Sequence, residues 1–250
     1  MTRRADHPRT RADILTADGV LAIVREPPAS PPPAPGQPAA IGANPLEGDE
    51  VLLALWDDGS VTALNGHVDL GTGLQTALAQ IVAEELDLTL ACVSMALGDT
   101  ARSPNQGATI ASASIQIHAQ PMRQAAAQAR AWLLARGADW LGVPVGAVET
   151  RLGVVRLRTE HHTHVPYGKL LAGQRTILRL DPGARLKDPA NYRIVGTRQP
   201  RVDIPQKLSG DTVFVHDMRV PGMLHGRVVR PPYAGADHGD YIGNTLESVD

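Results

Sequence analysis

The sequence predicts an α/β fold in which mixed sheets pack against helices. Short apolar runs of strand length, at residues 51–56, 60–64 and 93–97, alternate with two longer segments, 74–88 and 112–136, whose apolar residues recur at helical spacing. The chain has 250 residues, of which 43% are hydrophobic, enough for one large or two small domains with a packed core. Only 3% are aromatic, so we expect that core to consist of leucine, valine, isoleucine and alanine.

Residues 1–49 are predicted to be a proline-rich arm or linker that precedes the folded part. They hold one short apolar run, residues 20–24, followed by eight prolines between Pro27 and Pro45. Because proline lacks a backbone N–H group, this stretch cannot build the hydrogen-bond ladder of a sheet and favours an extended chain. The composition fits an undocked tail, and it also fits an arm that wraps around another subunit. Folded structure is expected to start near Glu50.

A β-hairpin is predicted at the start of the folded part. Residues 57–59, Asp-Asp-Gly, form a turn signal between the apolar runs 51–56 and 60–64. The next strand is expected to lead to Leu70.

A helix is predicted behind that strand, over residues 74–88. One of its faces is apolar, and it consists of Leu74, Ala77, Leu78, Ile81, Val82 and Leu88. Glu85 falls on the same stripe and is expected to have a local polar partner. A strand is predicted at 93–97, and Cys92, which precedes it, is interpreted as an inert core thiol.

The second long helix is predicted over 112–136, with a kink or an early break at Pro121 and a stop at Gly137. Its alanine-rich face would allow a neighbouring element to approach closely. A short helical piece and a hairpin are expected over 138–172. Residues 161–164 hold three histidines in the turn of that hairpin, and we interpret them as a solvated loop because no acidic or cysteine partner lies at metal-ligand spacing.

Residues 173–189 are predicted to be an irregular connector, and the irregular pattern extends to about residue 206. From Lys207 the pattern is that of β-structure again, with strands expected at 211–217 and 223–229 around a turn at Pro221 and Gly222. Residues 190–250 are therefore expected to begin a second domain, which we expect to be incomplete at residue 250.

The most informative stretch for function is residues 66–76, in which Gly71-Thr72-Gly73 forms the corner between the strand and the helix. Two glycines let the backbone approach a ligand closely, and a helix N-terminus offers free N–H groups and a partial positive charge, which favour a phosphate. A Rossmann-type dinucleotide loop is one interpretation, with Asp99 at the end of the following strand as the ribose ligand. The third glycine of that motif is replaced by Thr76, and a tight turn alone also explains the glycines.

A second polar segment, residues 105–114, follows about 35 residues later. Its small residues expose main-chain N–H groups and its hydroxyls add donors, so it can saturate a phosphate or a pterin edge without a charged side chain. The residues Gly107, Ala108, Thr109, Ala111, Ser112 and Ser114 are the candidates. Together with the glycine corner they predict a large anionic cofactor.

Charge and cysteine content exclude several classes of function. The net charge of −2 gives no electrostatic reason to expect nucleic acid. The single cysteine excludes a disulfide, a cysteine-ligated zinc site and an iron–sulfur cluster within this chain. No metal ligands are predicted. No apolar run approaches membrane-spanning length and the N-terminus lacks an apolar signal core, so we expect a cytoplasmic location, with membrane association only through partners.

The two candidate segments and their surroundings resemble the molybdopterin-binding large subunit of the xanthine dehydrogenase/aldehyde oxidoreductase family. The nearest branch is that of isoquinoline 1-oxidoreductase β-subunits and nicotinate dehydrogenase large subunits. The resemblance covers about residues 50–250 and is carried by residues 66–87, 98–100, 105–114, 192–197, 201–207, 215–218 and 220–232. It implies that residues 50–172 are part of the molybdopterin-binding domain and that 190–250 begin an α/β hammerhead domain.

The resemblance implies a molybdenum hydroxylase that acts on an electron-poor carbon of an N-heteroaromatic substrate such as nicotinate, with water as the oxygen source. The cofactor would be a molybdenum pterin, as the cytosine dinucleotide. Electrons would leave through a 2Fe-2S cluster on a small iron–sulfur subunit and then to cytochrome c. Gly71, Thr72 and Gly73 would contact the cofactor from one side, and Thr109, Ala111, Ser112 and Ser114 from the other. Many members have glutamine where this chain has Thr72, which reaches less far.

No residue of this chain matches the catalytic glutamate of the family, so no catalytic residue is assigned. The chain is therefore expected to be an N-terminal part of the large subunit, to need the rest of that subunit as a partner, and to be inactive alone. Two alternatives stay open. One is an NAD-dependent dehydrogenase that uses the glycine corner, and the other is a non-catalytic remnant that keeps the fold and binds a partner.

Overall fold

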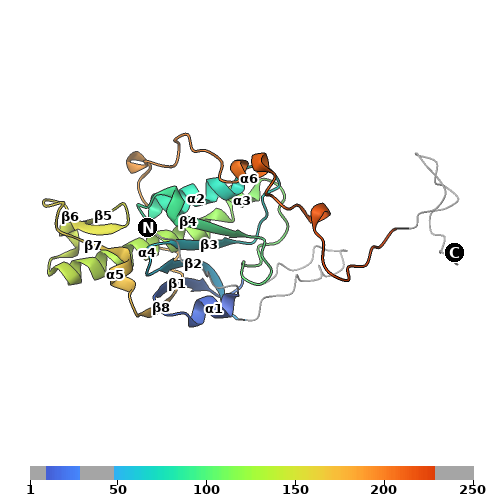
Figure 1. Cartoon of the computed structure of the whole chain (residues 1–250). Coiled ribbons are helices and arrows are strands. Elements are labelled where there is room, and N and C mark those ends of the chain that lie inside the picture. Colours follow the sequence, from blue (N-terminus) through green and yellow to red (C-terminus); the bar gives the residue numbers. More distant parts are fainter. Residues whose placement is uncertain (1–9, 29–47, 229–250) are drawn as a thin grey trace, which may run out of the picture. The chain divides into compact units, whose positions relative to one another are not determined.

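The structure, a computed structural model, describes residues 10–28 and 48–228. The chain divides into two compact units, Met1–Pro205 and Gln206–Asp250. A five-stranded mixed sheet forms the centre of the first unit (Figure 1). Its strands lie in the order β4-β3-β2-β1-β8 and are β1 (Val20–Arg25), β2 (Glu50–Trp56), β3 (Val61–Asn65), β4 (Val93–Leu97) and β8 (Arg175–Arg179).

Strand direction follows the way the strands are connected. The turn at residues 57–59 joins β2 and β3 as an antiparallel hairpin, which confirms that prediction. Helix α2 (Leu74–Glu85) crosses from β3 to β4, and these two strands are parallel. At the other edge β1 is antiparallel to β2 and parallel to β8. The predicted α/β class is confirmed.

Two helices, α2 and α4 (Ala119–Leu141), cover one face of the sheet. Successive strand residues point to opposite faces, so Leu21 and Ile23 pack under these helices while Val20 and Ala22 point to the other side. On that side α1 (Arg11–Thr16) contributes Ile14, and the indole Nε1 of Trp56 donates to Thr62 Oγ1 at 3.0 Å. Strands with two covered faces read as continuous apolar runs, which explains the sequence of β2.

Helix α4 also packs against a second, three-stranded sheet, β5 (Val148–Arg151), β6 (Val154–Leu157) and β7 (His164–Pro166). A Cβ atom on Gly137 would come within 2.5 Å of Val155 Cγ1, so glycine permits this close approach. The predicted stop at Gly137 is wrong. The helix continues to Leu141, and Gly142 ends it in the left-handed conformation with φ 68°.

The helix predicted over 112–136 consists of two helices in the structure. A short helix, α3 (Ala113–Gln116), precedes α4, and the break falls at Ile117 and His118. Pro121 lies in the first turn of α4, where its missing N–H costs nothing. The helix therefore breaks close to the predicted position, but before the proline and not at it.

The expectation that folded structure starts near Glu50 is wrong for residues 10–28. The apolar run at 20–24 is β1, which pairs with a strand on each side and is buried on both faces. Because β1 lies between β2 and β8, every side chain of this run is buried. Residues 29–47, which hold most of the proline-rich stretch, lie outside the described residues.

Two segments predicted from local pattern have another structure. Residues 66–73 form no strand, because the chain leaves the sheet after Asn65 and turns through two left-handed glycines. Within the predicted connector 173–189, β8 is a strand at the sheet edge. The remaining short elements of the first unit are α5 (Tyr167–Leu171) and the 3-10 helices Leu90–Cys92, Val145–Ala147 and Pro189–Asn191.

Residues 185–203 run along α2, where buried carboxylates bind them. Glu84 Oε2 accepts the N–H groups of Arg193, Ile194 and Val195 at 2.6–3.0 Å. Glu85, whose polar partner was expected from the sequence, accepts from Arg123 Nε at 2.8 Å and from Arg130 Nη1 at 2.5 Å. Residues 190–205 thus belong to the first unit and not to a separate one.

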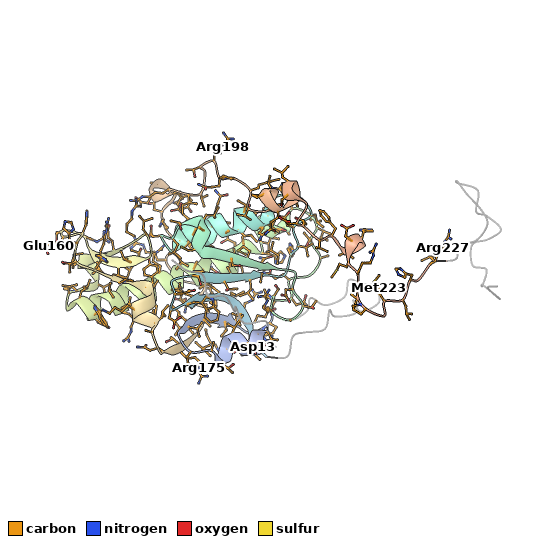
Figure 2. The ribbon with its side chains drawn as sticks, viewed as in Figure 1. Asp13, Glu160, Arg175, Arg198, Met223 and Arg227 are labelled. Atoms are coloured by element: carbon orange, nitrogen blue, oxygen red, sulfur yellow. The ribbon has the colours of Figure 1, made fainter. Side chains whose placement is uncertain are left out.

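The described part of the second unit contains no strand. It holds most of α6 (Ile204–Ser209) and a 3-10 helix, Val215–Asp217, so the strands predicted at 211–217 and 223–229 are not found within residues 206–228. Its large apolar side chains, such as Leu224 at 94% and Val215 at 81%, are exposed. In the first unit the exposed Asp13, Glu160, Arg175 and Arg198 extend outward (Figure 2).

Candidate functional site

The two segments singled out in the sequence meet around one pocket. The glycine corner (residues 66–73) and the polar loop (residues 105–114) line a surface pocket of about 380 Å³ together with the start of α2 and of α3. Its lining residues are Leu70, Thr72, Leu74, Ala77, Thr109, Ile110, Ala111, Ser112, Ser114 and Ile115. Five of the predicted site residues therefore share the pocket, whereas Gly71, Gly73, Gly107 and Ala108 are not among its lining.

The N-terminus of α2 carries its own carboxylate. Asp69 accepts the N–H groups of Gly71 at 2.9 Å, Gly73 at 3.1 Å and Gln75 at 3.0 Å. Burial raises the pKa of Asp69, but these three hydrogen bonds outweigh it and the net pKa lies below its usual value. The sequence had suggested that the N–H groups of the two glycines would bind a phosphate. They are not free to do so, because Asp69 already accepts both of them.

Asp69 was not a predicted site residue, although its position gives a signal. An aspartate two residues before a glycine favours an Asx-turn, in which the carboxylate accepts backbone N–H groups further along the chain. Gly71, at φ 96°, and Gly73, at φ 80°, supply the left-handed conformations that wrap the chain around this carboxylate.

Hydrogen bonds join the glycine corner to the polar loop. Gly66 N–H donates to Gln106 Oε1 at 2.7 Å, and Val68 N–H donates to Thr109 Oγ1 at 3.0 Å. A Cβ atom on Gly66 would lie 2.2 Å from the Pro104 carbonyl oxygen, so only glycine allows the two segments to pass this closely. These contacts hold the two segments in place and therefore fix the shape of the pocket.

His67 is the buried centre of this contact, fully shielded from solvent. Its Nδ1 lies 2.7 Å from Ser114 Oγ and its Nε2 lies 3.4 Å from the Gln106 carbonyl oxygen. A carbonyl can only accept, so this arrangement assigns the proton to Nε2 and makes the Ser114 hydroxyl the donor to Nδ1. Ser114, a predicted cofactor contact, thus donates its hydroxyl proton to His67 and not to a ligand.

A second histidine, His118, packs against His67, with ring centroids 4.3 Å apart. Burial lowers the pKa of His118, and the neighbouring His67 and Arg25 lower it further. No periodic signal in the sequence pointed to either histidine, because their roles depend on contacts between segments.

The start of the polar loop is held by Glu50, which is 1% exposed. Glu50 Oε1 accepts the N–H of Asn105 at 2.8 Å, while Oε2 pairs with Arg25 Nε at 2.8 Å. A buried carboxylate in strand β2 thus positions the loop. Further along the loop, Ala111 and Ser112 both have positive φ angles, 54° and 55°. Such angles in residues other than glycine cost on the order of 1–3 kcal/mol each and cluster at binding sites.

Several hydrogen-bond donors on the pocket have no acceptor within residues 10–28 and 48–228. Among the described residues the N–H groups of Thr72, Ala111 and Ser112 donate to no acceptor, and neither do the hydroxyls of Thr72 and Ser112. Thr109 Oγ1 accepts from Val68 and keeps its own proton to donate. These donors come from both sides of the pocket and fit an acceptor-rich group such as a phosphate or a pterin ring. The residues present therefore fit a pterin nucleotide.

The rim of the pocket is apolar, and a cationic group holds the glycine corner beside it. Leu70 and Ile110 are 71% and 67% exposed. Arg201, in a segment first noted for its family resemblance, donates from Nη1 to the Gly71 carbonyl oxygen at 2.8 Å and pairs with Asp203. The hydrogen bond with Asp203 raises the pKa of Arg201. Arg201 therefore holds the glycine corner from outside the pocket.

The geometry does not favour a Rossmann-type site at this corner. Asp69 occupies the helix N-terminus that would receive a pyrophosphate. Asp99, the predicted ribose ligand, accepts from the N–H of Ala101 at 2.9 Å and from Arg102 Nε at 2.8 Å. Burial raises the pKa of Asp99, but the N–H of Ala101 and the hydrogen bond and charge of Arg102 outweigh it, so the net pKa is lowered.

Other residues singled out in the sequence lie away from this pocket. His161, His162 and His164 are exposed, as predicted; the first two lie between β6 and β7, whereas His164 is the first residue of β7. The described residues contain no group of three metal-ligating side chains. Cys92 is half-buried beside Thr89, whose Oγ1 lies 3.3 Å from the sulfur, so it is less buried than the predicted core thiol. No helix in residues 10–28 or 48–228 has the length and apolar character needed to cross a membrane.

Several known proteins are similar to this chain. The family described as "Molybdopterin cofactor-binding domain" matches residues 28–199. A subunit of nicotinate dehydrogenase from Pseudomonas putida is 49% identical over 96% of this chain and 20% of its own length. The β-subunit of isoquinoline 1-oxidoreductase from Brevundimonas diminuta is 29% identical over 74% of the chain and 29% of its own length.

Among solved structures, CO dehydrogenase from Oligotropha carboxidovorans has a TM-score of 0.42 and 26% identity over 46% of this chain and 14% of that chain. The chain spans between a fifth and a third of the two curated relatives. The family match covers more than half of the chain, including both segments of the pocket. The chain belongs to the molybdopterin cofactor-binding domain family.

Proposed function

We propose that this chain is the part of a molybdenum hydroxylase large subunit that binds the pterin nucleotide of the molybdenum cofactor. One observation carries the proposal: donors from two segments, about forty residues apart in the sequence, face the same pocket without partners in the described protein. The phosphates and the pterin ring of such a cofactor offer the matching acceptors.

Different pocket residues would make different hydrogen bonds to the cofactor. The N–H and hydroxyl groups of Thr72 and Ser112, with the N–H of Ala111, would donate to the cofactor from opposite sides. Thr109 would donate its remaining proton. Because Asp69 is a negative charge at the start of α2, we propose that a phosphate lies toward the polar loop and not at the helix N-terminus.

The other predicted site residues would shape the pocket without binding the cofactor themselves. We propose that Gly71, Gly73, Gly107 and Ala108 shape the two segments, since they do not line the pocket. Ser114 would position the polar loop through His67. The hydroxyl of Thr72, shorter than the glutamine common in the family, limits direct contact to groups close to the corner.

When bound, a molybdenum pterin, which we propose is the cytosine dinucleotide, supplies the redox centre for hydroxylation of an electron-poor carbon with oxygen from water. The substrate class we propose is an N-heteroaromatic acid like nicotinate. Two relatives, a nicotinate dehydrogenase subunit and an isoquinoline 1-oxidoreductase subunit, are named after N-heteroaromatic compounds, and of these two compounds only nicotinate is an acid. We assign the activity to the assembled enzyme, with electrons passing to a 2Fe-2S cluster on a small subunit and then to cytochrome c.

The domain assignment is also a proposal. Residues 50–172, joined by β1 and β8 in one sheet, form part of the molybdopterin-binding domain. Because residues 190–205 belong to the first unit, we propose that the hammerhead domain begins at about residue 206 and not at residue 190.

The test uses the intact enzyme complex, purified through a tag on the subunit that contains this chain. The wild type should contain molybdenum and release a pterin nucleotide on denaturation. A Thr72→Val, Ser112→Ala double variant should keep its unfolding temperature and lose most of its pterin. Thr163→Val, which removes an exposed hydroxyl in the segment between β6 and β7, is the matched control and should retain full content.

Two alternatives give other results. A nicotinamide-dependent dehydrogenase would bind NAD in a calorimetric titration, which we expect to be flat. A non-catalytic remnant of the fold would leave the activity of the complex unchanged in the double variant. An active wild-type complex without molybdenum would refute the proposal.

A further inference from the structure

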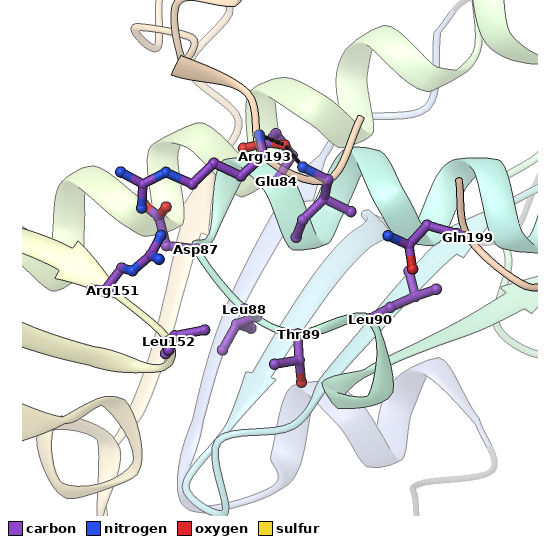
Figure 3. Close-up of a pocket in the computed structure, with 10 residues that line it drawn as sticks. Glu84, Asp87, Leu88, Thr89, Leu90, Arg151, Leu152, Arg193 and Gln199 are labelled. Carbon is purple, nitrogen blue, oxygen red and sulfur yellow. Dashed lines mark hydrogen bonds between the residues drawn. The ribbon is translucent and has the colours of Figure 1, made fainter. Parts of the chain in front are cut away.

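A second pocket, away from the polar loop, lies between α2, the β5–β6 hairpin and the segment 193–199. It has a volume of about 280 Å³. Figure 3 shows two arginines, Arg151 and Arg193, reaching toward the same end of it, close to Asp87. The apolar side chains Leu88, Leu90 and Leu152 also line it. The pocket thus pairs cationic groups with an apolar floor.

Neither arginine has an ionic partner among the described residues. The two carboxylates that line the pocket are already bound: Glu84 to Lys187 Nζ at 3.1 Å and Asp87 to the same Nζ at 2.7 Å. Asp87 also accepts from Thr150 Oγ1 at 2.7 Å. Three cations therefore face two carboxylates here, and the two guanidinium groups are available to a further carboxylate.

The positions of these arginines are fixed by the backbone. The N–H of Arg193 donates to Glu84 Oε2 at 2.8 Å. Arg151 is the last residue of β5, where it pairs with Val154 across the hairpin. The backbone of both arginines is therefore anchored, at a strand end and on a segment bound to α2, which keeps both guanidinium groups at the same pocket.

The hairpin tip beside the pocket holds a strained and exposed leucine. Leu152 and Gly153 form the two-residue turn between β5 and β6, with φ angles of 46° and 80°. Turns with positive φ at both positions favour Asn-Gly, because leucine at such an angle is strained. Yet Leu152 keeps 63% of its surface exposed, so the fold gains little from the side chain.

A small soluble anion would use the arginines but would give no reason for an exposed leucine on the rim. A polypeptide that carries an acidic residue next to an apolar one would use both. We propose that this pocket is a docking site for a partner subunit, which inserts an aspartate or glutamate between Arg151 and Arg193 and packs an apolar side chain on Leu152. This proposal rests on the proposed function only in that the chain works within a multi-subunit enzyme.

The test compares three variants of the intact complex, each isolated through a tag on this subunit. Mass photometry at decreasing concentration measures the fraction of complexes that retain every subunit. Charge reversal of both arginines, Arg151→Glu with Arg193→Glu, should raise the dissociation constant by at least about tenfold, and the wild-type value should rise steeply with salt. Arg198→Glu, an exposed arginine in the same segment but outside the pocket, is the control and should match the wild type.

Leu152→Asn separates docking from folding. Asparagine is favoured in this turn, so the variant should unfold at the same or a higher temperature and still release the partner subunit more readily. Equal dissociation of all variants and the Arg198→Glu control would overturn the proposal. A second outcome would also overturn it. In that outcome the complex of the arginine variant stays intact, and the variant loses only the thermal stabilisation that added citrate gives to the wild type. The pocket would then bind small carboxylates and not a partner subunit. Molybdenum content, measured on the same samples, tests the proposed function separately.

Discussion

The ring of His67 joins the two sides of the candidate cofactor pocket, with Nδ1 2.7 Å from Ser114 Oγ and Nε2 3.4 Å from the Gln106 carbonyl oxygen. The histidine belongs to the glycine corner and both partners belong to the polar loop. Because it is fully buried, the relative position of the two segments depends on this side chain more than on any exposed contact.

Replacing His67 should therefore loosen the pocket. His67→Leu leaves the Ser114 hydroxyl and the Gln106 carbonyl oxygen without their partner, at a cost of about 1–3 kcal/mol. Urea unfolding of the chain measures the loss. Ser114→Ala removes only one of these hydrogen bonds and should cost less, and equal stability of His67→Leu and the wild type would contradict the assignment.

Asp69 should stabilise the start of α2 in its ionised form. Its folded pKa is below the unfolded value of about 3.9, so its contribution is present above pH 4 and is lost as the pH falls through the folded pKa. Asp69→Ala should cost about 1 kcal/mol at pH 7 and much less near pH 2. Unfolding curves at both pH values check this, and a difference that does not change with pH would argue against the carboxylate cap.

Glu85 should be among the most sensitive positions of the chain. It is 1% exposed and pairs with Arg123 and Arg130, so Glu85→Leu leaves two partly buried cations without their counter-charge. We expect a loss of about 3–5 kcal/mol. If Glu85→Leu combined with Arg130→Met recovers none of that loss, the ion pair is not its source.

The contact of α4 with the small sheet should not tolerate a methyl group. Gly137→Ala would place Cβ 2.5 Å from Val155 Cγ1, with an expected cost of about 1–3 kcal/mol despite the better helix propensity of alanine. Val155→Ala in the same chain makes room and should restore part of the stability. Thermal unfolding of the single and double variants distinguishes this clash from a general effect on α4, which the second change would not relieve.

The sequence predicted elements whose signals are local. The turn at residues 57–59 and the apolar face of α2 identified the β2–β3 hairpin and the helix, and the small polar residues of 105–114 identified one side of the pocket. β1 and β8 were missed because their pairing joins Val20 to Arg175, which lie far apart in the sequence. Proline-rich composition around β1 also obscured its apolar run. The role of Asp69 had a local signal, whereas those of His67 and Glu50 arise only from contacts between segments.

The pterin content of the Thr72→Val, Ser112→Ala complex tests the central claim most directly. Denaturation releases the pterin nucleotide, and its fluorescence after oxidation gives the amount per complex. The account predicts a content well below that of the Thr163→Val control at an unchanged unfolding temperature. Equal pterin content in the double variant and the control would contradict it, because the free donors of the pocket would then play no part in holding the cofactor.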